Sequence, residues 1–150
     1  MATLAQFSRN IRKRGSQIEN SATRIVKQSS KAALRALVYG TKVDKGVARS
    51  NWRVGIGAPT RAVIPAYAPY PKGSKANGAG MLENANASAA IAAGNARINA
   101  VAGARGVGLT TAIYISNNIP YPAQAFPAGM VATALIQARA TIKGFRVFER

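Results

Sequence analysis

The amino-acid sequence predicts an α+β domain with a long N-terminal helix, a small antiparallel sheet and two further helices. Three observations lead to this prediction: a helical repeat across the first forty residues, two short stretches with strand alternation, and two later stretches with helical spacing. The elements follow one another as helix, strand, loop, helix, strand, helix, so the two strands can pair antiparallel. We expect residues 1–150 to form a single domain, because a chain of this length buries about two-thirds of its unfolded surface.

Residues 1–40 predict a long basic helix. Apolar side chains recur every seven positions, and further apolar side chains flank the same stripe, which is a helical period. The stripe consists of Leu4, Phe7, Ile11, Ile18, Ala22, Ile25, Val26, Ala32, Ala33 and Ala36. No proline precedes Pro59, so the helix either runs unbroken through Gly15 or divides there, and Gly40 ends it.

The stretch VDKGVARSNWRVGIGAP, residues 43–59, predicts a turn followed by a strand. Asp44 and Gly46 are typical of the turn. Every second residue from Trp52 to Ile56 is apolar, which indicates a strand over residues 50–57 with one buried face. Trp52 is the single Trp of the chain. We expect it to be a core anchor between this strand and a helix, with a partner for its N–H group.

Residues 58–80 are rich in proline and glycine and predict a long loop. This loop mixes aromatic and cationic side chains, an arrangement found both where single-stranded nucleic acid stacks and where a protein partner docks. We keep both alternatives for the candidate docking residues, which are Arg61, Tyr67, Tyr70, Lys72 and Lys75.

The second half of the chain predicts a helix, a strand and another helix. Residues 81–103 are alanine-rich, and we expect a thin apolar face formed by Leu82, Ala85, Ala89, Ala92 and Ala96. Residues 107–118 alternate like a strand. A last helix is expected from Pro127, with Met130, Val131, Ala134, Leu135, Ala138 and Ile142 at helical spacing, before a short edge strand at residues 144–148.

No charged residue occurs between residues 107 and 138, whereas the N-terminal third of the chain is strongly basic. The uncharged region has two explanations that the sequence leaves open. It forms part of the core, or it lies at a subunit interface, since interfaces exclude charge from their centres.

The chain carries 21 Lys and Arg against 4 Asp and Glu, a net charge of +17, which favours a polyanionic partner. A solvated helix face usually interleaves Glu with Lys, but Glu19 is the one acid expected in the first helix. We therefore weigh an anion-facing or DNA-facing surface against an ordinary solvated face. The candidate residues are Arg9, Arg12, Lys13, Arg14, Arg24, Lys27, Lys31 and Arg35.

Catalysis and cofactor binding are not expected. The sequence has no His and no Cys, and its four acids fall in separate predicted elements, so no catalytic residue, metal ligand or cofactor site is assigned. The glycosylation sequon Asn86-Ala87-Ser88 is interpreted as chance because no secretory signal precedes it, and no membrane-spanning segment is expected.

Four segments resemble one known family. The stretch VDKGVARSNWRVGIGAP is similar to the V-D-x-G-x-A-R-x-N-W signature of small neck or tail-completion proteins of tailed bacteriophages. IPAYAP (64–69) with ENANASAAIAAG (83–94), AIYISNNIPY (112–121) and PAGMV (127–131) follow in the family's order. The family often has an acidic loop before the last segment, where this chain has only PAQAF (122–126), so a contact made by that loop is not implied here.

The resemblance implies a non-enzymatic structural protein of the virion, assembled in the host cytoplasm. Such a protein forms a homo-oligomeric ring, a hexamer, at the head–tail junction, where it contacts portal or connector proteins and tail proteins. Genomic DNA passes through the ring without being read for sequence. The residues alone also allow a different function, that of a free-standing basic nucleic-acid-binding protein acting as a monomer or dimer.

Overall fold

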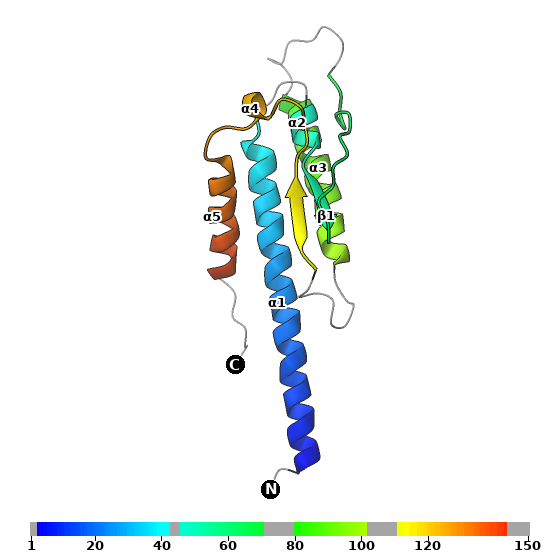
Figure 1. Ribbon diagram of the computed structural model, residues 1–150, viewed down its shortest axis with the longest axis vertical. Coiled ribbons are helices and arrows are strands. Elements are labelled where there is room, and N and C mark those ends of the chain that lie inside the picture. Colours follow the sequence, from blue (N-terminus) through cyan, green and yellow to red (C-terminus); the bar gives the residue numbers. More distant parts are fainter. Residues whose placement is uncertain (1–2, 43–45, 71–79, 102–110, 144–150) are drawn as a thin grey trace.

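The computed structural model describes residues 3–42, 46–70, 80–101 and 111–143. Along the chain it contains α1 (Leu4–Gly40), α2 (Val47–Ser50), β1 (Arg53–Ile56), α3 (Gly80–Ala100), β2 (Ile113–Ser116), α4 (Pro122–Ala125) and α5 (Met130–Lys143). Helix α5 packs on one side of α1, while the sheet and α3 lie on the other side (Figure 1). The α+β fold with a long N-terminal helix and a small antiparallel sheet is confirmed.

Helix α1 is continuous over 37 residues, including Gly15, and spans about 55 Å. It begins with a capping box, in which the Thr3 hydroxyl accepts a hydrogen bond from the Gln6 backbone and the Gln6 side chain accepts one from the Thr3 backbone. Its N-terminal half extends beyond the other labelled elements (Figure 1), and every residue from position 3 to position 20 is exposed. Only the second half of α1 therefore enters the core, through Leu34, Leu37 and Val38.

Strands β1 and β2 form a two-stranded antiparallel sheet. Its register pairs Arg53 with Ser116, Val54 with Ile115, Gly55 with Tyr114, and Ile56 with Ile113. The first strand begins later than the alternation predicted, because Gly46 adopts a positive φ of 74° and starts the helical turn α2. The second strand occupies only part of the predicted stretch, whose residues 107–110 lie outside the described residues, as does Asp44.

The main core lies where α1, α3, α5 and β1 meet. It consists of Leu34, Leu37, Val38, Trp52, Val54, Ala87, Ala90, Ile98, Met130 and Ala134. Helix α3 lies close to α1 and β1 because Gly94 has no side chain. A Cβ at this position would collide with the Leu34 side chain and lie 3.1 Å from Cγ2 of Val54. Leu34 is fully buried and cannot swing aside to make room.

The predicted apolar face of α3 is wrong. The helix buries Asn86, Ala87, Ala90, Gly94 and Ile98, whereas Ala85, Ala92 and Ala96 of the predicted face are exposed. Small apolar residues surround this helix on every side, so their positions do not mark one face. The face is chosen by the small Gly94, which allows close packing, and by the buried polar contacts of Asn86.

The predicted last helix is confirmed as α5, but it begins at Met130 rather than at Pro127, because the positive φ of Gly129 precedes it, and only part of its apolar residues are buried. Met130 and Ala134 are buried, while Val131, Leu135 and Ile142 are exposed, because α1 covers only one side of α5. The turn before α5 holds the short helix α4, which the sequence did not predict, and the Lys42 amide donates to the Ala125 carbonyl at 2.9 Å. The expected edge strand at 144–148 lies outside the described residues.

A matched pair of glycine substitutions tests this packing. We expect Gly94→Ala to lower the free energy of unfolding by about 1–3 kcal/mol, because the added methyl group overpacks the contact with Leu34 and Val54. Gly15→Ala is the control, since nothing lies within 4 Å of its Cβ position. It should leave the core packing unchanged and stabilise helix α1 by up to about 1 kcal/mol. Urea denaturation followed by circular dichroism measures both; equal stability of the two variants would contradict the close approach at Gly94.

Candidate nucleic-acid interface

A row of cations follows α1 beside α3. Arg24, Lys27, Lys31 and Arg35 are spaced by three or four residues, so they lie on one side of the helix. Lys27 donates from Nζ to the Asn99 carbonyl of α3 at 3.0 Å, and the Arg35 guanidinium lies 5.8 Å from the centre of the Tyr39 ring. Lys27 and Arg35 are thus held in place by neighbouring groups while their charge stays near the surface.

The same side of α1 continues into its free half. Arg9 and Lys27 are separated by about five full turns, as are Lys13 and Lys31, so both pairs project in the same direction. We call the six residues on this side the basic line: Arg9, Lys13, Arg24, Lys27, Lys31 and Arg35. Arg12 and Arg14 flank it on either side of the helix. All eight sequence-predicted cations therefore lie on α1, and six of them share one face.

Few acidic groups offset these cations. Within the described residues, Arg9, Arg12, Lys13, Arg14 and Lys31 form no ion pair. The positive potential along α1 is consequently available to an external anion.

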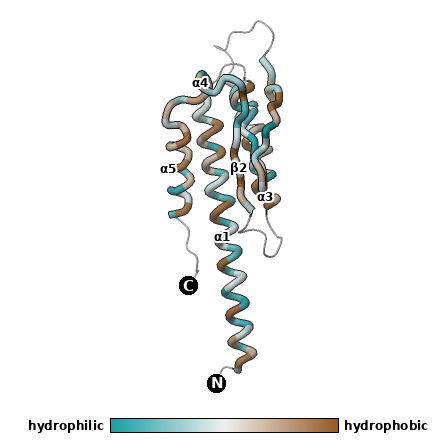
Figure 2. Tube along the Cα trace, viewed as in Figure 1, coloured by the Kyte–Doolittle hydropathy of each residue, from teal (hydrophilic) through white to brown (hydrophobic). Residues whose placement is uncertain are grey.

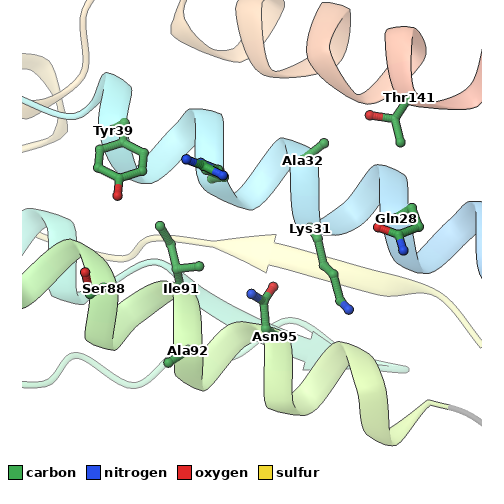
Figure 3. Close-up of a pocket in the computed structure, with 10 residues that line it drawn as sticks. Gln28, Lys31, Ala32, Tyr39, Ser88, Ile91, Ala92, Asn95 and Thr141 are labelled. Carbon is green, nitrogen blue, oxygen red and sulfur yellow. The ribbon is translucent and has the colours of Figure 1, made fainter.

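A groove of about 590 Å³ lies between α1 and α3, beside the end of α5. Lys31 of α1 and Asn95 of α3 reach into it, with Gln28, Ser88 and Thr141 around them (Figure 3). The Asn95 Oδ1 atom is buried and has no hydrogen-bond partner within the described residues. The described lining of the groove has cationic, amide, hydroxyl, aromatic and aliphatic groups and no carboxylate, so it can bind a polar or anionic group.

The predicted docking loop is described only up to Tyr70. Arg61 and Tyr67 are exposed and Tyr70 is partly buried, whereas Lys72 and Lys75 lie outside the described residues. The end of β2 holds the start of the loop, because Ser116 and Asn118 both donate side-chain hydrogen bonds to the Thr60 carbonyl, at 2.9 and 2.6 Å. The start of the loop is thus fixed to the sheet at Thr60.

Two buried asparagines fix the rest of this segment. Asn51 donates to the Ile64 carbonyl and accepts from the Ile64 amide, both at 2.7 Å. Asn86 binds the Ala68 backbone in the same paired way, at 2.9 and 2.8 Å, and also accepts from the Ser50 hydroxyl at 2.9 Å. Asn86 belongs to the sequon interpreted as chance, and its position in an apolar helix is the available signal of a buried polar role.

Trp52 lies in the core immediately before β1, with 7 % of its surface exposed. Its Nε1–H donates to the Thr41 hydroxyl at 2.7 Å, and that hydroxyl donates to the Leu37 carbonyl at 2.7 Å. The ring also packs against Phe126, with ring centres 5.3 Å apart. The indole therefore joins the end of α1, the start of the sheet and the segment after α4.

Comparison with known proteins gives no relative: no family model, no curated protein and no solved structure matches this chain.

The described residues contain neither a metal-binding cluster nor a membrane-spanning helix. Among the described residues, no three His, Cys, Asp or Glu side chains gather closely enough to hold a metal ion. No helix in the described ranges is long and apolar enough to cross a membrane.

Truncation of Trp52 tests the core. We expect Trp52→Ala to cost about 3–5 kcal/mol of stability through the loss of buried area. Thr41→Val should cost about 1–3 kcal/mol, because it leaves the indole N–H buried and unpaired. Chemical denaturation measures both variants, and an unchanged midpoint for Trp52→Ala would refute its role as a core anchor.

Truncation of Asn86 tests the attachment of the loop. Asn86→Ala should cost about 1–3 kcal/mol and leave the Ala68 backbone without its partners, so trypsin should cut faster after Arg61. Asn84→Ala, at an exposed position of the same helix, is the control and should change neither stability nor cleavage. Cleavage at the wild-type rate in Asn86→Ala would show that this residue does not hold the loop.

Proposed function

We propose that this protein is a non-enzymatic structural protein of a tailed bacteriophage that forms a ring at the head–tail junction, around the path of the DNA. The observation that carries the proposal is the basic line, which extends along both halves of α1. A surface of this kind suits a duplex that moves past it, because cations on one face neutralise phosphates without reading bases. The resemblance of four short segments to neck and tail-completion proteins is the ground for the proposed position in the particle.

The shape of α1 supports an assembled rather than an isolated protein. Among the residues that the structure describes, nothing packs against the first half of α1, which exposes large apolar side chains, including Leu4 and Phe7. Exposed apolar surface of this extent is typical of sites that a partner covers. The groove beside Lys31 lacks carboxylates and agrees with a binding role rather than a catalytic one.

The alternative function, a free-standing nucleic-acid-binding protein, uses the same cations in a different way. It requires the isolated chain to bind duplex DNA tightly, with an affinity that falls steeply as salt increases. Six aligned cations would give a slope of log affinity against log salt of about −5. The ring function instead places the cations around a shared lumen, so a single subunit should bind DNA weakly.

Disruption of the gene in the phage or prophage that encodes the chain tests the proposal. We expect DNA-filled heads and separate tails in electron micrographs, because the junction cannot form, and wild-type protein supplied from a plasmid should restore joined particles. Joined, infectious particles without the protein would overturn the proposed function.

A charge variant then separates the two functions. We expect a triple variant of the basic line to form joined particles that deliver less DNA; its substitutions are Lys27→Gln, Lys31→Gln and Arg35→Gln. The control is Arg139→Gln combined with Lys143→Gln, which removes charge from α5 and leaves the basic line unchanged. Tight, salt-sensitive binding of duplex DNA by the isolated protein, together with its absence from purified particles, would favour the free-standing function.

A further inference from the structure

The free half of α1 presents an apolar stripe that no other element of the described chain covers. Leu4, Phe7, Ile11 and Ile18 recur at spacings of three, four and seven residues, so they share one side of the helix. All four are exposed, Leu4 to 85 % and Ile11 to 55 %. Figure 2 shows apolar and polar positions alternating along this half of α1, which extends past the other labelled elements.

Helix α5 presents a second apolar stripe. Val131, Leu135, Ala138 and Ile142 are spaced by four, three and four residues, which is the same helical period. Val131, Leu135 and Ile142 are exposed, since α5 uses its Met130 and Ala134 side against the core. One chain therefore carries two unpartnered stripes of the same period, about 21 Å long on α1 and about 16 Å long on α5.

The two stripes cannot meet within one chain. Because α1 is a single continuous helix, its free half points away from the α5 that packs against its second half (Figure 1). A second copy can bring them together. This contact joins two different surfaces, and such heterologous contacts close into rings when the rotation between copies allows it.

Charge distinguishes this contact from pairing of two α1 helices. Arg14 lies at the edge of the α1 stripe, between Ile11 and Ile18, and Arg12 is the next nearest cation on the other flank. Pairing α1 with α1 would place these cations side by side in a confined space, which is unfavourable. The α5 surface carries no charge from Met130 to Ala138, and its two cations, Arg139 and Lys143, lie at its C-terminal end. The first two turns of α5 can therefore receive the apolar stripe while the long arginine side chains reach outward to water.

We infer that the free half of α1 in one copy docks on the exposed face of α5 in the next copy. This inference rests on the proposed function, because that function requires the copies to close into a ring. It adds which two surfaces form the contact between neighbouring copies. A contact of three or four helical turns buries less than the roughly 800 Å² per partner of a stable pairwise interface. Copies should therefore remain mostly separate when dilute and assemble when many joints form together.

Cysteine cross-linking tests the pairing directly, because the native chain contains no Cys. Ile11→Cys and Leu135→Cys are made in separate full-length proteins, mixed at high concentration and oxidised. We expect a disulfide between the two variants, since facing residues of packed helices come within disulfide distance, and little linkage in either variant alone. Ile136→Cys is the matched control, because Ile136 is exposed to a similar extent but projects from another side of α5.

Each other result overturns the inference. Linkage of Ile11→Cys to itself would show that α1 pairs with α1, and equal linkage to Leu135→Cys and Ile136→Cys would show random collision. Absence of linkage in a concentrated sample and in assembled particles would show that the stripes do not meet. Circular dichroism of each variant confirms that the change leaves the fold intact, as expected at exposed positions.

The test separates this inference from the proposed function. If Ile11→Cys and Leu135→Cys link specifically but the protein is absent from virions, the joint is real and the head–tail function fails. If the protein is found at the junction of joined particles but the pair does not link there, the function stands and the joint fails. Leu135→Lys gives a second measurement. At high concentration, where we expect the wild-type protein to associate, light scattering should show no association of Leu135→Lys and wild-type association of Ile136→Lys.

Discussion

The close approach of α3 to α1 and β1 at Gly94 is the constraint on which the rest of the structure depends. With no side chain at this position, Leu34 of α1 and Val54 of β1 fill the space directly against the α3 backbone. This contact sets the side of α3 that faces the core and thereby places Asn95 across the groove from Lys31. The position of the basic line relative to α3 is thus a consequence of packing rather than of charge.

Three consecutive residues connect this core to the remainder of the chain. Ser50 bonds to Asn86 of α3, Asn51 bonds to the backbone of Ile64, and Trp52 bonds to Thr41 at the end of α1. Each polar group is almost fully buried and has its partner, which agrees with the cost of leaving such groups unpaired. The short segment from the last residue of α2 to the start of β1 therefore fixes a helix, a loop and the end of another helix at once.

The sequence predicted the types of element well, because α1, β1 and β2 have clear periods of 3.6 or 2. It could not predict the buried face of α3, since alanines occur on all sides of that helix and only the neighbours Leu34 and Val54 reveal why Gly94 must face them. It also missed the role of Asn86 and Thr41, because a polar residue in a sequence does not show whether its partner lies in a distant segment. For the candidate site, residue spacing could place the eight cations on one helix, but the groove with Asn95 required the tertiary structure.

The continuity of α1 has a mechanical consequence. Its tip and its buried end belong to one rigid rod, since the hydrogen-bonded ladder passes Gly15 without interruption. A sideways force on the tip acts at a distance from the pivot formed by Leu34 and Val38, and tightly packed interiors transmit strain. Displacement of the tip is therefore carried to Leu37 and Thr41, and from Thr41 to the indole beneath the sheet, so the exposed half of the helix acts as a lever on the core.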